Sequence, residues 1–299
     1  DIIRVVTPGT VIEDAMLEEG KNNFLAAVSV TDTGIGLCFT DVSTGECHAT
    51  VLGCDNSVSG VADELARFTP KELLISEDLE KASAALCDYI KEKFTQTVTV
   101  RPKESFNAQR TEPLIVKHFG ESRLKELGID NKNPIASALG AVMDYLYETG
   151  KNGNISVNKL DVYSGTQYMR LDITAIRNLE LTETMRTKSK KGSLLWVLDK
   201  TKTAMGKRLI RSWLQKPLIN ITAVNLRQNA VEELCSDTVL RGEAIEYLSG
   251  IRDVERLMSR VVYGTASARD LNAVAQTAHR FPILKGLLSA VNCKMLKEI

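Results

Sequence analysis

The first hundred residues alternate short apolar runs with turn residues, which is a pattern typical of a sheet. Asp32-Thr33-Gly34 and Ser43-Thr44-Gly45 interrupt the apolar runs and have the composition of hairpin turns. The pattern therefore predicts an antiparallel meander of three strands, over residues 24–30, 35–42 and 46–52.

Alternating helices and strands follow the meander. Apolar residues spaced by three and four predict helices over residues 58–68 and 78–94, and shorter apolar runs predict strands over 73–75 and 97–101. Because crossovers between parallel strands are right-handed, both later strands should lie parallel to the first strand. The order βββ-α-β-α-β predicts an α/β domain with an RNase H-like, mixed five-stranded sheet and helices.

The remainder of the chain has helical spacing almost throughout. Asn133-Pro134 has the form of an N-cap followed by proline at the first helical position, and it begins a helix that we expect to bridge two domains. A chain of 299 residues exceeds the usual size of a single core. We therefore predict an α/β domain over residues 1–131 and an all-α helical bundle over 132–299. Later helices are expected over residues 193–198, 204–214, 222–236, 238–248, 253–262 and 267–281.

One short stretch, residues 169–181, separates two kinds of pattern. An apolar run ends at Asp172, and helical spacing at Ile173, Ile176 and Leu179 follows it. The Asp172 carboxylate stands where it accepts the first free backbone amides of that helix, at the positive end of the helix dipole. Asp172 is therefore predicted to be the N-cap of a helix at a structural junction.

The net charge of the chain is zero, but the charges are unevenly distributed. Residues 1–130 carry 13 Lys and Arg against 22 Asp and Glu, whereas residues 186–216 carry 10 against 1. The acidic N-terminal domain argues against wrapping DNA by itself. The basic stretch is interpreted first as a solvated or salt-bridged face. Its second interpretation is a set of DNA-phosphate contacts, made by Lys188, Lys190, Lys191, Lys207, Arg208 and Arg211.

Composition excludes several other classes of protein. No run of eighteen apolar residues predicts a membrane-spanning helix. The six cysteines show no C-x-x-C spacing, so neither a zinc site nor a disulfide framework is predicted. No leader pattern follows Asp1, and we expect the protein to be cytoplasmic.

An RNase H-like sheet raises the alternative of a metal-dependent nuclease with a helical accessory domain. Such a nuclease needs carboxylates that converge from the first strand, the first helix and the fourth strand. The first strand has no acidic residue inside it. The acids near the required places are interpreted as turn and surface residues that do not hold two metal ions: Asp32, Asp41, Glu64 and Glu77.

No other catalytic constellation is evident. The chain has no G-x-x-x-x-G-K-[ST] phosphate loop, and its three histidines are far apart in the sequence. We therefore predict no catalytic, metal or cofactor site in this chain.

The junction also resembles a known family. The sequence R-L-D-x-x-A-x-R-N-L-E is similar to the opening of the core domain in the MutS family of mismatch-recognition ATPases, and its matching residues are Leu171, Asp172, Arg177, Asn178, Leu179 and Glu180. Further matches lie at residues 4–10, 41–45, 192–195 and 205–208. Their order and spacing agree along almost the whole chain.

The resemblance implies a fragment, made of a connector domain with the RNase H-like fold and the first part of a helical core (lever) domain. Such a fragment would be no enzyme itself and would relay changes between the mismatch-binding, clamp and ATPase domains of the family. It would contact MutL through the connector, and duplex DNA mainly through domains outside this chain. The full-length protein would be a homodimer that binds mismatched DNA, ATP and magnesium.

Overall fold

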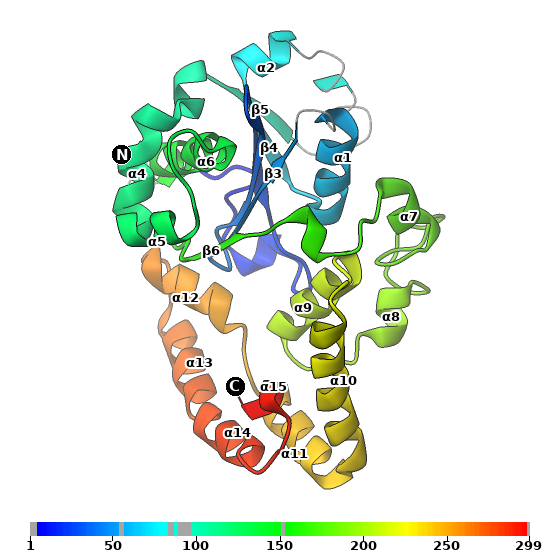
Figure 1. Ribbon diagram of the computed structural model, residues 1–299. Coiled ribbons are helices and arrows are strands. Elements are labelled where there is room, and N and C mark those ends of the chain that lie inside the picture. Colours follow the sequence, from blue (N-terminus) through cyan, green and yellow to red (C-terminus); the bar gives the residue numbers. More distant parts are fainter. Residues whose placement is uncertain (1–4, 54–56, 83–86, 89–96, 151–152, 298–299) are drawn as a thin grey trace. The chain divides into compact units, whose positions relative to one another are not determined.

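The computed structural model describes residues 5–53, 57–82, 87–88, 97–150 and 153–297 (Figure 1). The chain divides into two compact units. The first consists of Asp1–Glu18 and Asn22–Gly165, and the second of Glu19–Lys21 and Thr166–Ile299.

The first unit contains a mixed sheet that has six strands among the described residues, in the order β5-β4-β1-β2-β3-β6. Strands β1 (Leu25–Thr31), β2 (Gly34–Asp41) and β3 (Glu46–Leu52) form the predicted antiparallel meander. Strands β4 (Glu72–Ser76) and β5 (Thr97–Arg101) continue the sheet parallel to β1, which confirms the predicted parallel arrangement.

A sixth strand, β6 (Lys159–Val162), was not predicted from the sequence. It pairs parallel with β3 and forms the other edge of the sheet. With only four residues and a single alternation of exposed and buried side chains, β6 offers too short a pattern to recognise. The pairing also extends the first unit to Gly165, beyond the boundary near residue 131 that the sequence suggested.

Helix α6 (Pro134–Gly150) belongs wholly to the first unit and does not bridge two domains. It packs on β1 and β2, while α4 (Ala108–Phe119) packs against it from outside. Helix α1 (Ser57–Phe68) covers the opposite face of the sheet (Figure 1). Because α6 lies between the sheet and α4, nearly all its side chains are buried, from Ile135 to Leu146. A helix that is apolar on nearly all sides is typical of a core. Its sequence does not show which domain that core belongs to, and for this reason the predicted domain boundary near residue 131 was wrong.

Two smaller helices also lie in the described part of the first unit. Helix α2 (Glu77–Ala82) begins where the second crossover helix was predicted, but most of residues 83–94 lie outside the described residues. Helix α5 (Glu121–Glu126) follows α4 after Gly120, whose φ of 80° lies in the left-handed region that favours glycine.

The second unit is helical, as predicted. It begins with α7 (Ile173–Asn178) and α8 (Leu194–Leu198), followed by α9 (Ala204–Gln215) and α10 (Ile221–Ser236). The remaining helices are α11 (Thr238–Ser249), α12 (Val254–Val262), α13 (Ala268–Ala278), α14 (Phe281–Leu288) and α15 (Lys294–Lys297). Side chains cap α7 to α13 at their N-termini, and Ser267 and Asp270 form a reciprocal capping box at α13.

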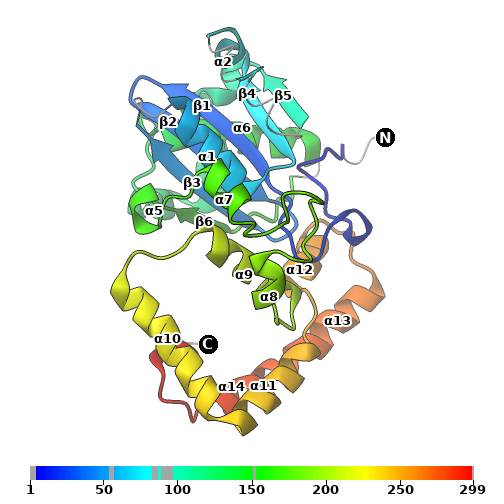
Figure 2. The same cartoon turned by 90° about the vertical axis from the view of Figure 1, so that its right-hand side faces the viewer.

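In the second unit, α10 contacts α11, and α11 contacts α14. Figure 2 shows α10 continuing into α11, with α14 beside α11. A small core forms there around Ile251, Leu284, Leu288 and Val291. Large apolar side chains of α8 remain exposed, among them Trp196 and Val197 at 48% and 54%. Helix α8 thus buries only Leu195, whereas α14 buries Leu284 and Leu288.

Candidate functional site: a buried arginine cluster

The junction motif shapes the start of the second unit. Asp172 Oδ1 accepts a hydrogen bond from the Ala175 amide at 2.6 Å, so the predicted N-cap of α7 is confirmed. Glu180 has a φ of 46°, and its carboxylate accepts the Met185 amide at 2.6 Å. Leu171 is buried, whereas four other motif residues are exposed: Asp172, Arg177, Asn178 and Leu179. The motif therefore fixes the start of α7 and the turn that follows it, and several of its side chains are exposed to solvent.

Four of the six cations considered for DNA contact pair with acidic side chains in the structure: Lys188, Lys190, Lys207 and Arg208. Lys188 Nζ lies 3.4 Å from Glu183, and Lys190 Nζ lies 2.5 Å from Asp199. These contacts agree with the salt-bridged interpretation of the surface. Lys191 is exposed and Arg211 is half-buried on α9. Contact between DNA phosphates and the three lysines Lys188, Lys190 and Lys191 stays a prediction.

Arg208 does not fit the DNA interpretation, because its side chain is only 5% exposed. Its guanidinium donates to both carboxylate oxygens of Asp253, at 2.7 and 2.8 Å, and to Glu255 at 2.8 Å. A bidentate arginine–carboxylate pair fixes both direction and distance. Arg208 thus links α9 to the N-terminal turn of α12 and is not available to a phosphate. Its i, i+3 spacing from Arg211 gave no sign of this buried role, because the partners lie 45 and 47 residues away.

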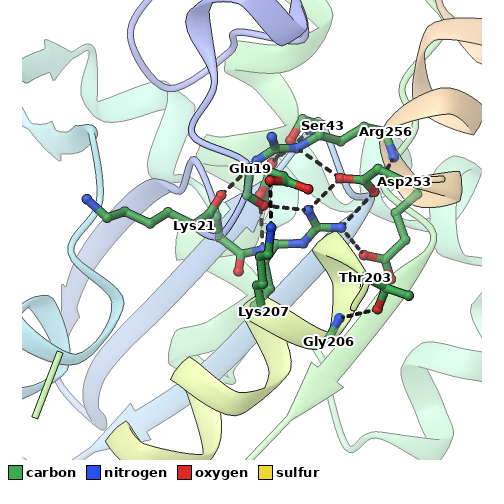
Figure 3. Close-up of polar contacts among 12 residues, drawn as sticks. Glu19, Lys21, Ser43, Thr203, Gly206, Lys207, Asp253 and Arg256 are labelled. Carbon is green, nitrogen blue, oxygen red and sulfur yellow. Dashed lines mark hydrogen bonds and ion pairs between the residues drawn. The ribbon is translucent and has the colours of Figure 1, made fainter. Parts of the chain in front are cut away.

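The same cluster holds the segment Glu19–Lys21, which is part of the second unit. Arg208 Nη1 donates to the Glu19 carbonyl at 3.3 Å, and Arg256 Nη2 donates to the Lys21 carbonyl at 2.7 Å. Lys207 Nζ donates to the Glu19 carboxylate at 2.7 Å (Figure 3). Three cations from α9 and α12 therefore hold Glu19 and Lys21, which are distant from both helices in the sequence.

Burial and ion pairing act in opposite directions on these groups. Burial alone would lower the pKa of Arg208, but the hydrogen bonds and charges of Asp253 and Glu255 raise it above its ordinary value. Burial would likewise raise the pKa of Asp253, but Arg208 holds it below its ordinary value. Both groups stay charged near neutral pH, so the cluster is a fixed electrostatic link and not an acid–base pair.

The acids considered for a nuclease are occupied by other bonds. Asp41 is fully buried, and its oxygens accept the Asn23 amide at 2.9 Å, the Ser43 amide at 2.9 Å and the Ser43 hydroxyl at 2.7 Å. Glu64 is 6% exposed and accepts bonds from Arg67 and from the Tyr163 hydroxyl. The interpretation of these two as surface acids was wrong. Asp32 and Glu77 are exposed, as expected.

A third buried acid, Glu72, was missed in the sequence. It is 1% exposed at the start of β4, and its oxygens accept bonds from Thr7, Gly9, Thr99 and Tyr145 at 2.6 to 2.9 Å. All of these partners lie at least 27 residues away, so no local pattern marked it. Glu72 fixes the segment around Gly9 on the sheet and takes no part in a carboxylate cluster.

Within the described ranges, no group of three or more His, Cys, Asp or Glu is arranged to hold a metal ion. In the same part of the chain, every helix is too short or too polar to cross a membrane. The buried thiols of Cys38 and Cys47 lie 3.5 Å apart, and Cys38 has a raised pKa because of the hydrogen bond to Cys47 and of burial. A thiol in this state is a core residue and not a nucleophile.

Comparison with known proteins accounts for both units. A family model described as MutS domain II matches residues 23–161, and one described as MutS domain III matches residues 174–299. DNA mismatch repair protein MutS of Ruminiclostridium cellulolyticum is 40% identical over 298 residues, which is 100% of this chain and 34% of that protein. The protein of the same name from Alkaliphilus oremlandii is 38% identical over 300 residues, again 100% of this chain and 34% of the relative.

The chain thus spans about a third of the length of the curated relatives that it matches. The two domain models adjoin near the division between the compact units, and neither comparison supports the RNase H-like nuclease alternative. The chain belongs to the MutS family and carries its domains II and III.

Proposed function

We propose that this chain is a non-catalytic relay module of a mismatch repair protein. Its first unit acts as the connector, and its second unit as the first part of the core. The observation that carries the proposal is the Arg208 cluster, which fastens α9, α12 and the segment Glu19–Lys21 to one another. Glu18 and Asn22, on either side of that segment, belong to the first unit. A displacement of α9 or α12 therefore acts directly on a segment that is continuous with the first unit.

The chemistry of the first unit supports a relay and not a nuclease. Asp41, Glu64 and Glu72 have their oxygens satisfied by protein donors. Recruiting any of them to a metal ion would break several buried hydrogen bonds, at about 1.5–3 kcal/mol for each bond to a charged group. The fold is used here as a scaffold.

We infer the binding partners from the family and from the net charge of the first unit. We assign MutL to the acidic first unit, because a surface with a net negative charge attracts a protein partner better than a phosphate backbone. Duplex DNA, ATP and magnesium are assigned to the rest of the full-length protein, as is the homodimer. The chain itself has no phosphate loop for ATP.

Isothermal titration of MutL into the 299-residue chain tests the partner assignment. Binding is expected, whereas titration with ATP and magnesium should release no heat of binding. The same preparation incubated with DNA or RNA and with Mg²⁺ or Mn²⁺ should leave the nucleic acid intact. Metal-dependent cleavage that persists after a second purification step would replace the relay with the nuclease.

A further inference from the structure

The edge strand β6 offers backbone groups to a further strand. The Lys159 amide donates to Gly45 at 3.0 Å and the Tyr163 amide donates to Ala49 at 3.0 Å, so alternate residues of β6 face β3. In a parallel pair the intervening residues then direct their backbone groups away from that neighbour. Leu160 and Val162 are those residues, and in the described part of the chain no strand lies beyond β6.

Side chains of α4 and α5 partly occupy this edge. Arg123 Nη2 donates to the Leu160 carbonyl at 3.4 Å, and His118 Nε2 donates to the Val157 carbonyl. The Arg123 bond is long, and its guanidinium is also 3.4 Å from Glu126, with 52% of the side chain exposed. Leu160 is only 5% exposed, so an added strand must displace the Arg123 side chain, whose bond to the Leu160 carbonyl is long and therefore weak.

A pocket of about 590 Å³ lies along the same edge. Phe119, Ile155, Val157 and Leu160 supply its apolar lining, and Arg123 and Lys159 supply positive charge. Asp161 also lines it, but its carboxylate lies 3.1 Å from His48 Nδ1. The pocket thus combines apolar contacts with an excess of positive charge beside a row of backbone groups.

We infer that this edge binds an extended peptide segment of a partner protein, which adds to the sheet beside β6. Main-chain hydrogen bonds to Leu160 and Val162 supply the affinity, and side chains in the pocket supply the specificity. The segment carries an acidic side chain, because the charged residues that line the pocket are two cations, Arg123 and Lys159, and one acid, Asp161. This inference goes beyond the relay function and does not depend on MutL being the partner.

The test uses a fluorescein-labelled peptide of sequence Val-Glu-Val-Glu-Val and the 299-residue chain, with fluorescence anisotropy as the readout. Binding is expected, with slower hydrogen exchange at the Leu160 and Val162 amides. Arg123→Glu should weaken binding roughly tenfold or more, which corresponds to about 1.4 kcal/mol. Lys125→Glu is the matched control on the same helix, because Lys125 does not line the pocket and pairs with Glu121. It should leave binding within about twofold of the original.

N-methylated peptides test whether the bound peptide pairs with β6 as a strand. Alternate amides of an added strand face its neighbour, so N-methylation at both Glu residues and N-methylation at the central Val should differ in effect. The peptide whose N-methyl groups fall on the amides that face β6 should lose affinity, and the peptide methylated on the other amides should keep it. Equal binding of both methylated peptides, no binding of the parent peptide, or an unchanged affinity for Arg123→Glu would each overturn the inference. Displacement of the peptide by inorganic phosphate alone would reassign the pocket to a small anion. Arg123→Gln serves if Arg123→Glu fails to fold.

Discussion

At the scale of single residues, Asp172 shows how a local hydrogen bond can be read directly from the chain. Its partner, the Ala175 amide, is three residues away, so the cap follows from sequence order alone. Replacing Asp172 by Ala should destabilise the second unit by about 0.5–2 kcal/mol, and Asp172→Asn by less, since the amide oxygen still accepts the bond. Urea unfolding followed by tryptophan fluorescence measures both variants. Equal and negligible losses would contradict the capping role.

His118 gives the first unit a dependence on pH. Burial lowers the pKa of His118, although the hydrogen bond to the Val157 carbonyl opposes this. The unfolded chain therefore binds a proton more readily, and stability should be complete above the unfolded pKa of about 6.5 and fall as the pH decreases below it. His118→Gln keeps a donor and removes the titration. Its free energy of unfolding should vary less between pH 7 and pH 5 than that of the original chain, and an identical slope would show that His118 contributes nothing.

Glu72 marks the limit of reading single residues. Its four partners are 27 to 73 residues away in the chain, on β5, on α6 and before β1. In the sequence, an acidic residue just before the apolar run Leu73–Ile75 is typical of the exposed first position of a strand. The neighbouring residues give no indication that Glu72 is buried. Capping residues could be predicted because their bonds are local, whereas Glu72 and Arg208 could not be placed because their bonds depend on the completed fold.

At the scale of elements, a glycine permits the close approach of α6 to the sheet. A Cβ at Gly36 on β2 would lie 2.0 Å from the Pro134 carbonyl oxygen at the start of α6. Gly36→Ala should therefore push the helix from the sheet and destabilise the first unit by about 1–3 kcal/mol, as overpacked cores do. Gly53→Ala is the control, because a Cβ there meets no atom within 4 Å. Thermal unfolding followed by far-UV circular dichroism compares the two, and equal melting temperatures would contradict the close packing.

The link between α9 and α12 can be tested in the same way. Arg208→Met removes the bidentate partner of Asp253 and the cation beside Glu255. Asp253 keeps a longer contact to Arg256, at 3.8 Å, so the change should cost the second unit about 3 kcal/mol. Lys207→Met, on the same helix, breaks a pair whose side chains are 31% and 65% exposed, and should cost at most about 1 kcal/mol. Both tryptophans, Trp196 and Trp213, lie in the second unit, so their fluorescence during urea unfolding reports on this unit. Similar losses for the two variants would remove the special role of Arg208.

The elements themselves were largely predictable, and their exceptions have a common cause. The meander, β5 and most helices have periodic patterns of five residues or more, which report local structure directly, and β4 is marked by a short, uniformly apolar run. Strand β6 and the position of α6 depend on what lies next to them. A four-residue strand and an almost uniformly apolar helix have no periodic pattern that indicates which elements they pack against. We therefore predicted α6 between two domains, whereas it lies inside the first unit.

At the scale of the whole molecule, the division at Gly165 predicts which pieces fold independently. A chain ending at residue 131 lacks α6, which buries Ile135, Leu139 and Val142 against the sheet and α4, and it lacks β6 as well. Such a piece would expose one face of β1 and β2 to water. It should therefore fail to fold, whereas a chain ending at residue 165 retains both faces of the sheet and should fold.

Amide NMR spectra of the two pieces provide the measurement. Dispersed resonances are expected for residues 1–165 and collapsed ones for residues 1–131. The contrast is strong because burying α6 removes several large apolar side chains from water, each worth about 1.5–3 kcal/mol, and a domain has only about 5–15 kcal/mol of net stability. A folded 1–131 piece would mean that α6 adds to a complete core, and would restore the boundary near residue 131 as the division between independently folding parts.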